Sequence, residues 1–460
     1  MGLAKEDRKI RYGKDIKMEQ KQLSSVLETT KQDRECSTQV SNQTSIWTRN
    51  MLTALSNGVK GGKWFSLIDK VYSLKTLKIA WQQVKSNKGS AGVDKQSIEQ
   101  FEYKEDTYLE ELHQSLKEQR YTPQPVKRVY IPKAGGKKRP LGIPVVKDRI
   151  VQTAIKMAIE PIYENEFLEC SYGFRPNRGC KDALRQVDTL LKEGYTWVVD
   201  ADMQSYFDTI SHDRLMRLLE EKISDQPLLA LIHKYLKQNI IDALKQWTPT
   251  TGTPQGAVLS PLLANLYLHP LDTMLTQSGY RVVRYADDFV ILSKSEDEAI
   301  RALEEVKEWV NNNDLQLHPD KTHIGNALIK GQGFEFLGYR FEAGKRFVRK
   351  KSLMSFKDKI RAKTKRSRPD SISEIIAELN PILRGWFNYF KHAHYTTFKG
   401  NDGFVRRRLR AIILTRNKKK NCFGITINAH KLYPNTYFAN LNLFTSNEEW
   451  GKAYQSRCGN

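Results

Sequence analysis

The sequence predicts an α+β protein, in which a region of alternating helices and strands precedes an all-helical basic block. Two observations support the first part. Apolar residues after Trp64 recur three and four apart, as in an amphipathic helix, and the segment YRVVRYADDFVILS places two apolar runs around a turn. A third observation supports the second part: residues 345–420, here called the basic block, carry 23 Lys and Arg against five acids, which is +18 of the net charge of +23.

The length and composition exclude several classes of protein. A chain of 460 residues allows two to four domains at about 100 to 200 residues each. No stretch resembles a signal peptide or an apolar span of about 18 residues, so we expect a cytoplasmic protein with no membrane partner. The five cysteines form no C-x-x-C pair, which argues against a disulfide framework and a zinc ribbon. The concentrated positive charge instead predicts a polyanionic partner.

The first half of the chain predicts a polar tail, two helices and one hairpin. Residues 1–45 have too few apolar side chains to form a core, so we expect a flexible tail. Helical spacing follows over 64–86 and again over 148–166. Between them, VKRVYIPKAGGKKRPLGIP has two β-rich stretches around a basic tip, which is typical of a hairpin.

Strands and helices alternate in the second half. We expect a strand at YTWVVDADM, a helix from His212, the hairpin YRVVRYADDFVILS, a helix over Glu296–Asn311 and a strand pair around FEFLGYRFEAG. This order predicts a sheet with helices packed on one side. Three helices are then expected in the basic block, at 351–366, 371–395 and 402–416.

Four aspartates could do chemistry at the ends of these strands. Asp287 and Asp288 are adjacent in the turn of a buried hairpin, and Asp200 and Asp202 share one face of the preceding strand. An acidic pair in a turn is most often only solvated. Adjacent carboxylates repel each other, however, so a bound divalent cation would favour their ionised form. Two Mg²⁺ ions bridged by such carboxylates catalyse phosphoryl transfer in many enzymes.

Several motifs together resemble the group II intron reverse transcriptases. Tyr285-Ala286-Asp287-Asp288 on a hairpin, after Asp202 and Phe207-Asp208, is similar to the palm of a reverse transcriptase. Further blocks occur in the family's order: NKGSAGVD from Asn87, RPLGIP from Arg139, SYGFRPNRG from Ser171, GTPQGAVLSPLLANLYL from Gly252, LHPDKT from Leu317, FEFLGYRF from Phe334 and, resembling the maturase or thumb domain, LNPILRGWFNYF from Leu379. YADD alone would be weak, but the ordered set is specific.

The resemblance implies a right-hand polymerase, with fingers and palm built from an antiparallel sheet plus helices and an all-helical basic thumb. The domain limits that we predict are a polar tail at 1–45, an N-terminal extension and start of the fingers at 46–125, fingers at 126–195, palm at 196–345, thumb or maturase domain at 346–420, and a short segment at 421–460. That last segment has no Cys pairs and no H-N-H pattern, so no endonuclease domain is expected.

The resemblance also implies a metal-binding triad and a nucleotide site. Asp202, Asp287 and Asp288 would bind two Mg²⁺ ions, with Asp202 preferred to Asp200 because it stands five residues before Phe207. The residues implied to surround the incoming nucleotide are Lys133, Arg139, Phe207, Gln255 and Lys321. Phe207 would leave no room for a 2′-hydroxyl and so select deoxynucleotides. Each has a simpler alternative: Phe207 as core, Gln255 as part of a turn, and the basic residues as solvated charges.

Two more groups of residues would contact nucleic acid. The primer terminus would be held by Phe336, Leu337, Gly338 and Tyr339. RNA and the primer–template duplex would be bound by the basic residues Arg384, Arg406, Arg407 and Arg408, for which a solvated charged face is the simpler alternative.

The main hypothesis is an RNA-directed DNA polymerase that uses deoxynucleotides, an RNA template, a DNA or RNA primer and two Mg²⁺ ions. Group II intron RNA is the expected template and partner in a ribonucleoprotein, and a DNA target site is a further candidate partner. A second hypothesis is a splicing maturase that needs no polymerase activity. A third is a related reverse transcriptase recruited to defence or repair. The sequence leaves the intron, the host, the target site and the oligomeric state open.

Overall fold

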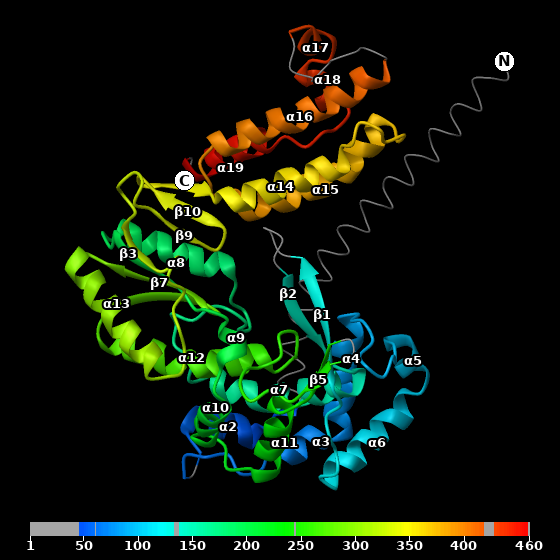
Figure 1. The fold of residues 1–460 in the computed structure, drawn as a ribbon, viewed down its shortest axis with the longest axis vertical. Helices are drawn as coiled ribbons and strands as arrows, with labels where there is room; N and C mark the ends of the chain where they lie inside the picture. The colour runs from blue at the N-terminus through cyan, green and yellow to red at the C-terminus, as the bar shows by residue number, and fades with distance from the viewer. Residues whose placement is uncertain (1–45, 60, 133–137, 243–244, 418–426, 459–460) are drawn as a thin grey trace, which may run out of the picture. The chain divides into compact units, whose positions relative to one another are not determined.

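The computed structural model describes residues 46–59, 61–132, 138–242, 245–417 and 427–458, and its mixture of helices and strands confirms the α+β class (Figure 1). The tail predicted at 1–45 lies outside the described residues. Within the described ranges, no helix is both long and apolar enough to cross a bilayer.

The chain forms two compact units, each discontinuous in sequence. The first unit contains the residues up to Gly179 together with Ser205–Thr273 and Asn313–Leu315. The second unit contains Cys180–Gln204, Met274–Asn312 and Gln316–Asn460. Because both units combine separate stretches of sequence, the predicted limits of fingers, palm and thumb stay a prediction.

Helices dominate the first unit, and α7 (Val146–Glu164) is its most buried helix. Nearly all of its side chains are buried, because α3 and α4 pack against it. The helix predicted from Trp64 is broken at Ser73, whose hydroxyl caps α4 by accepting from the Thr76 N–H. The other helices of this unit are α2 (Arg49–Asn57), α3 (Ile68–Tyr72), α4 (Leu74–Ser86), α5 (Ile98–Tyr103), α6 (Glu105–Lys117), α9 (Tyr206–Thr209), α10 (His212–Glu220), α11 (Gln226–Leu236) and the first part of α12 (Ser260–Gln277).

A four-stranded sheet completes the first unit, in the order β2-β1-β4-β5. The strands are β1 (Val126–Pro132), β2 (Lys138–Ile143), β4 (Ile240–Asp242) and β5 (Lys245–Trp247). β1 and β2 pair antiparallel, with Ile131 opposite Arg139, so the predicted hairpin is confirmed. Its basic tip, including Lys133, lies outside the described residues.

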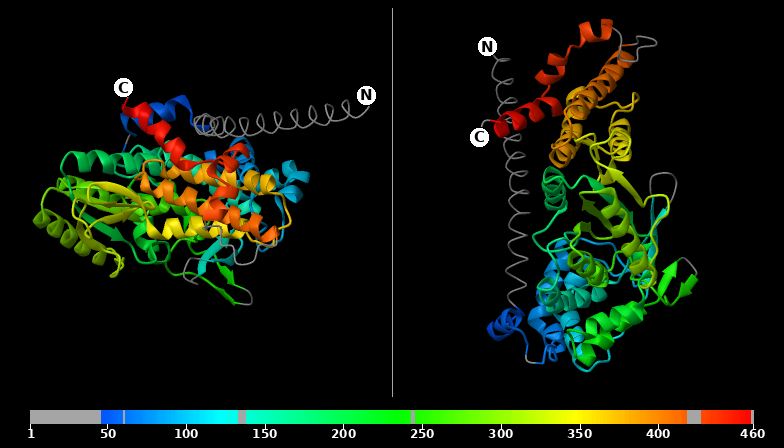
Figure 2. Two further views of the ribbon diagram at one scale, coloured as in Figure 1. Left: turned by 90° about the horizontal axis from the view of Figure 1, so that it is seen from above. Right: turned by 90° about the vertical axis from the view of Figure 1, so that its left-hand side faces the viewer.

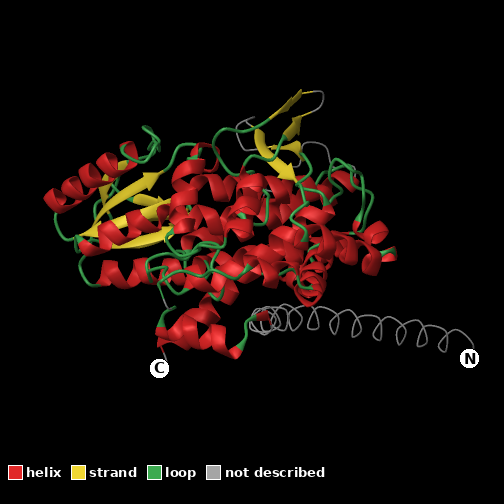
Figure 3. Ribbon diagram, turned by 90° about the horizontal axis from the view of Figure 1, so that it is seen from below, coloured by secondary structure: helices red, strands yellow, loops and turns green. Residues whose placement is uncertain are grey.

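The second unit contains a four-stranded antiparallel sheet that we call the carboxylate sheet. Its order is β6-β7-β3-β8, and its strands are β3 (Trp197–Asp202), β6 (Arg281–Tyr285), β7 (Asp288–Ser293) and β8 (His323–Asn326). The helix α13 (Glu296–Asn311) contacts β3 and β7, and α8 (Cys180–Lys192) contacts β6. Figure 3 shows these strands in yellow, side by side, with red helices against them. The predicted helix over Glu296–Asn311 has exactly the observed limits.

A second, smaller sheet follows the carboxylate sheet in the chain. It contains β9 (Phe334–Phe336), β10 (Tyr339–Glu342) and β11 (Lys345–Val348), in the order β11-β10-β9. The predicted strand pair is therefore joined by a third strand. β9 also contacts β3 and β7, so this sheet lies against the carboxylate sheet.

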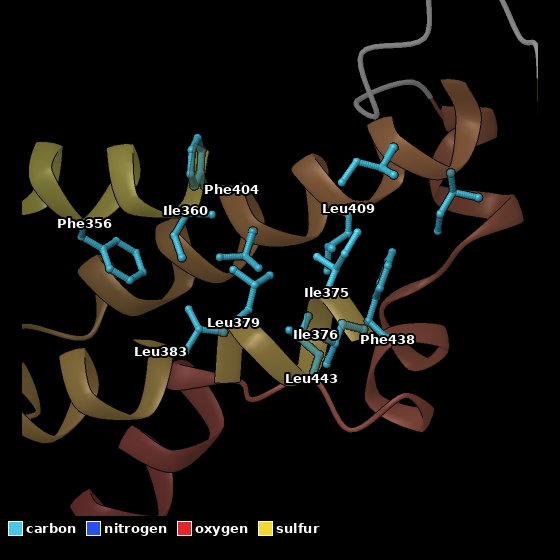
Figure 4. Packing of buried hydrophobic residues seen from close by; sticks show 13 residues of the cluster. Phe356, Ile360, Ile375, Ile376, Leu379, Leu383, Phe404, Leu409, Phe438 and Leu443 are labelled. Atoms are coloured by element: carbon cyan, nitrogen blue, oxygen red, sulfur yellow. The ribbon is translucent and has the colours of Figure 1, made fainter. Parts of the chain in front are cut away.

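Helices α14 to α19 form what we call the helical block. They are α14 (Lys350–Lys363), α15 (Ile372–Phe390), α16 (Thr396–Arg416), α17 (Ile427–Leu432), α18 (Asn435–Asn440) and α19 (Ser446–Cys458). Both views of Figure 2 show α14, α15 and α16 lying side by side. Their shared core includes Phe356, Ile376, Leu379 and Leu409, as Figure 4 shows.

Two features of the helical block differ from the sequence prediction. The last of the three expected helices begins at Thr396 rather than at 402, because buried Phe398 anchors its first turn and the helix continues through Gly400. The residues after 427 also join the same core, to which they contribute Phe438 and Leu443. Buried Asp402 fastens α19 to α16, since it accepts hydrogen bonds from the N–H groups of Ser446 and Asn447.

Candidate active site

Two aspartates face each other across neighbouring strands of the carboxylate sheet. Asp202 is the last residue of β3, Asp288 is the first residue of β7, and the two are direct partners in the antiparallel register. Side chains directly opposite in such a pair have Cβ atoms about 4.5 to 5.5 Å apart. Asp287 precedes Asp288 in the turn that joins β6 to β7. The two carboxylate-bearing strands predicted from the sequence therefore do lie side by side.

The turn before Asp288 has a strained backbone. Tyr285 and Asp288 are paired, which leaves Ala286 and Asp287 as a two-residue connection. Ala286 has a φ of 60°, a left-handed conformation that is uncommon for a residue with a Cβ. The fully buried guanidinium of Arg284 donates a hydrogen bond of 3.0 Å to the Ala286 carbonyl. Strained conformations of this kind persist where the surroundings hold them, and they are frequent at active sites.

Burial and mutual repulsion disfavour the charged forms of two carboxylates in this cluster, Asp288 and Asp200. Burial raises the pKa of Asp288 to about 8, with further contributions from the charges of Asp200, Asp202 and Asp287, while Arg349 lowers it. Burial also raises the pKa of Asp200 to about 6, although that carboxylate accepts a hydrogen bond from the Glu335 N–H. A cation bound among these oxygens would remove the repulsion.

The chemistry of this cluster fits a magnesium site. Carboxylate oxygens are the hard ligands that Mg²⁺ prefers. The Lys321 ammonium forms an ion pair with Asp202 and so supplies a positive charge at this point. In the part of the chain that the structure describes, no three His, Cys, Asp or Glu side chains already converge as a metal site. The aspartates are thus brought together by strand register, and a divalent ion bound to Asp202 would replace its ion pair with Lys321.

The turn between β9 and β10 lies next to this cluster in the same unit. Phe336 and Tyr339, which the sequence places at a primer terminus, have fully buried side chains. Leu337 and Gly338 form the tip and are partly exposed. Of the four residues predicted to hold the primer, Leu337 and Gly338 are therefore the two whose side-chain positions are open to contact, together with the backbone of the turn.

Phe207 belongs to the first unit and is held by aromatic packing. Its ring makes edge-to-face contacts with Phe174, at a centroid distance of 6.4 Å, and with Tyr206, at 5.6 Å. Its carbonyl accepts a hydrogen bond of 2.7 Å from the Thr253 N–H, which joins it to the loop that contains Gln255. The ring is 8% exposed, so its position is well determined by its neighbours.

Gln255 and Arg139 are hydrogen-bonded to each other in the first unit. The Gln255 side-chain oxygen accepts from the Arg139 Nε at 2.8 Å, and the Gln255 carbonyl accepts from the Gly142 N–H at 2.6 Å. The loop is further fixed by buried Gln152 on α7, whose Oε1 accepts from the Val258 N–H. Arg139 and Gln255, which the sequence predicts to lie near the nucleotide, are therefore in direct contact in the first unit.

A cavity of about 290 Å³ opens beside Gln255. Arg128 lies over the Trp247 ring at 5.1 Å on its wall, and Asp208 and Thr253 also line it. The sequence did not single out Arg128 and Trp247 as lining residues, because neither is part of a recognised motif. Asp208 belongs to the Phe207-Asp208 motif of the sequence. Burial raises the pKa of the Asp208 carboxyl, while the charges of Arg128 and Arg139 lower it.

The arginines predicted to bind nucleic acid differ in their surroundings within the helical block. Arg407 is exposed, with its guanidinium 5.4 Å from the Phe404 ring, and exposed Arg384 lies 4.8 Å from the Phe444 ring. Arg406 is partly exposed. Arg408 donates to the backbone carbonyl of Thr364 at 2.6 Å and to its hydroxyl at 3.0 Å. Arg408 is therefore largely committed to packing inside the block.

Comparison with known proteins agrees with this arrangement. The model of the reverse transcriptase (RNA-dependent DNA polymerase) family matches residues 131–341, and the model of the group II intron, maturase-specific domain matches residues 353–429. Among solved structures, a chain of a partial Cas6-RT-Cas1–Cas2 complex is 25% identical, with a TM-score of 0.34 over 54% of this chain and 42% of that one.

Two curated relatives share clear sequence similarity with this chain. Protein YkfC of Escherichia coli (strain K12) is 38% identical over 271 residues, which cover 50% of this chain and 70% of YkfC. The group II intron-encoded protein LtrA of Lactococcus lactis subsp. cremoris is 41% identical over 204 residues, or 43% of this chain and 33% of LtrA. The aligned part is thus only a third of LtrA. On this evidence the chain belongs to the family of group II intron reverse transcriptases and maturases.

Proposed function

We propose that this protein is an RNA-directed DNA polymerase that copies group II intron RNA, or other RNA, into DNA and also binds the intron RNA to assist its splicing. The observation that carries the proposal is the direct pairing of Asp202 with Asp288 at the end of the carboxylate sheet, with Asp287 beside them. The similarity to LtrA, whose name describes an intron-encoded protein, supports the intron as partner.

Three aspartates would hold the catalytic metal. Asp202, Asp287 and Asp288 supply the carboxylate oxygens, and two Mg²⁺ ions bound there would stabilise both the attacking and the leaving oxygen in phosphoryl transfer. The Lys321 ammonium is ion-paired with Asp202 in this structure, and a metal ion bound to Asp202 would release it. Lys321 is then available near the phosphates of the nucleotide.

The first unit would select and orient the incoming nucleotide. The packed Phe207 ring would exclude a 2′-hydroxyl, which makes deoxynucleotides the substrate. The hydrogen bond from Arg139 fixes the side chain of Gln255, which would lie beside the nucleotide and the template base. Arg139, together with Lys133, would bind the triphosphate.

The helical block would bind nucleic acid through its exposed bases. Arg384, Arg406 and Arg407 would contact phosphates of the intron RNA and of the primer–template duplex. The partly exposed tip at Leu337 and Gly338 would meet the primer terminus. The protein would work in the cytoplasm as a ribonucleoprotein, and a DNA target site would be its further partner.

Extension of a primer on an RNA template with Mg²⁺ and deoxynucleotides tests the polymerase. We expect Asp288→Asn and Asp202→Asn each to lower the rate about 10³-fold or more, because each removes a metal ligand. Asp297→Asn, which changes an exposed acid at the start of α13, is the matched control and should extend at the wild-type rate. Near-normal activity of either site variant would exclude that residue from catalysis.

Sugar selection tests the nucleotide site separately. Phe207→Val should admit ribonucleotides while the metal ligands stay in place, because the smaller side chain opens space beside the sugar. The measurement is the ratio of kcat/KM for deoxynucleotides to that for ribonucleotides. An unchanged ratio would mean that the ring serves only to pack against Phe174 and Tyr206.

Splicing of the intron RNA separates the two activities. The Asp287→Asn, Asp288→Asn double variant should still bind the RNA and promote splicing but make no DNA copy. An Arg384→Gln, Arg407→Gln variant should lose both activities together. If the wild-type protein leaves splicing unchanged, the maturase part of the proposal is wrong and the polymerase part is unaffected.

A further inference from the structure

The turn between β9 and β10 has an unusual backbone for its sequence. Phe336 pairs with Tyr339, so Leu337 and Gly338 form a two-residue hairpin connection. Both have positive φ, 47° at Leu337 and 83° at Gly338, as a type I′ turn requires. Glycine adopts this conformation freely, whereas leucine does not. Something outside the turn must therefore hold Leu337 in place.

Helix α15 supplies that hold through Tyr389. The Tyr389 hydroxyl donates a hydrogen bond of 2.8 Å to the Leu337 carbonyl. In the other direction, the Tyr339 hydroxyl donates one of 2.6 Å to the Tyr389 carbonyl. These reciprocal bonds join the two ends of the turn to one residue of the helix. A third bond, from the Arg349 N–H to the Gly338 carbonyl at 2.9 Å, fixes the tip.

The same turn is linked to the carboxylates on its other side. The Glu335 N–H on β9 donates to Asp200 at 3.2 Å, and Asp200 is two residues before Asp202 on β3. Burial and the neighbouring Cys180 side chain at the start of α8 raise the pKa of both Tyr285 and Tyr389. Tyr285 begins the turn that carries Asp287 and Asp288. Hydrogen bonds thus tie the β9–β10 hairpin to α15 on one side and, through Glu335 and Asp200, to β3 on the other.

We propose that Tyr389 is a positioning residue. Its hydroxyl fixes the position of the Leu337–Gly338 turn relative to the Asp202–Asp288 pair, and so places the 3′-hydroxyl of a primer held by that turn. This inference rests on the proposed polymerase function. Tyr389 itself does not touch the reacting atoms. Its effect is on geometry, and a small displacement of reacting groups lowers a rate strongly while changing affinity little.

Tyr389→Phe isolates the hydroxyl, because it keeps the ring contacts with Tyr339 and Phe390. In single-nucleotide addition we expect the maximal rate to fall about tenfold. The deoxynucleotide concentration for half-maximal rate and the affinity for the primer–template should each change less than about twofold. A general loss of structure would instead change affinity and thermal stability together.

Tyr433→Phe is the matched control. It removes a hydroxyl of the same helical block, which accepts a hydrogen bond of 3.0 Å from the Asn417 side chain, far along the chain from the turn. We expect wild-type kinetics. Equal rates for Tyr389→Phe and Tyr433→Phe would overturn the inference.

Leu337→Gly gives a second, independent test. Glycine needs no support to adopt positive φ, so Tyr389→Phe should slow the Leu337→Gly protein much less than it slows the wild type. The same tenfold loss in both backgrounds would overturn the proposed mechanism. Wild-type activity in this assay reports on the proposed function: if the wild type does not extend a primer, the polymerase proposal fails, whereas an active wild type with an unaffected Tyr389→Phe variant contradicts only the positioning role.

Discussion

At the ends of β3 and β7, aspartates of like charge are brought together, and burial with mutual repulsion raises the pKa of Asp288 to about 8. In the helical block, by contrast, the 1% exposed guanidinium of Arg410 is surrounded by acceptors: it donates to the Tyr433 carbonyl at 2.8 Å and to the Asn435 side chain at 2.9 Å. In the first region the clustered carboxylates lower stability, and this is where we propose that a cation binds. The second uses its charge to hold helices together. The net charge of a segment therefore does not show what its charged residues do. The hydrogen-bond and ion-pair partners of each charged side chain show it.

The largest expected effect is at Arg410. Arg410→Met should lower the free energy of unfolding by about 2 to 4 kcal/mol, because it leaves the Tyr433 carbonyl without its donor and detaches α18 from α16. Urea denaturation of the full chain measures it. The exposed Arg407→Met is the control and should cost less than about 0.5 kcal/mol. A similar loss in both variants would contradict a structural role specific to Arg410.

A smaller effect separates Arg408 from Arg407. Arg408→Gln should cost about 1 to 2 kcal/mol of stability, because its bonds to Thr364 are lost, with little change in the salt dependence of RNA binding. Arg407→Gln should leave stability unchanged but reduce the slope of log K against log salt by about 0.7 to 0.9. Binding isotherms at several salt concentrations give the slope. If the two variants had the same slope and the same stability, the distinction between a structural Arg408 and an RNA-binding Arg407 would be wrong.

The opposite sign is expected at the carboxylate sheet. Asp288→Asn removes one of the repelling charges, so at pH 8 and above, without divalent metal, it should raise the free energy of unfolding by about 1 kcal/mol. The same variant is expected to be inactive. Thermal denaturation without and with Mg²⁺ measures the effect, and Mg²⁺ should stabilise the wild type more than the variant. A destabilised variant would show that Asp288 is a structural residue.

The smallest expected effect is on the pH dependence of stability, through the buried carboxyl of Asp148. Asp148 in the first unit is completely buried and accepts hydrogen bonds from the Tyr121 hydroxyl, the Gln238 side chain and the Gln124 N–H. Burial nevertheless raises its pKa to about 6 from 3.8. Because the folded value is the higher one, its contribution to stability is complete below pH 4 and is lost as the pH rises through 6. Asp148→Asn should flatten the change in stability between pH 4 and 7, and a curve parallel to that of the wild type would contradict this.

Much of the fold could be predicted because it depends on local patterns. The two apolar runs around YADD give the β6–β7 hairpin, and the capped, amphipathic segment at Glu296 gives α13 with its observed limits. The start of α16 could not be predicted, because the helix continues through Gly400 on the strength of Phe398 packing in the core. The docking of α19 likewise depends on Asp402, which is distant in sequence.

For the candidate site, the sequence by itself determined which residues are chemically able to act: the adjacent aspartates, the aromatic residue five after Asp202, and the basic segments. Only the tertiary structure decided how they are used. Strand register pairs Asp202 with Asp288, and α15 places the Tyr389 hydroxyl on the Leu337 carbonyl. Hydrogen bonds tie the partly exposed Arg408 to Thr364 and the buried Arg410 to Tyr433. The physical reason is that residue type and spacing carry charge and periodicity, whereas burial and hydrogen-bond partners arise between segments far apart in the chain.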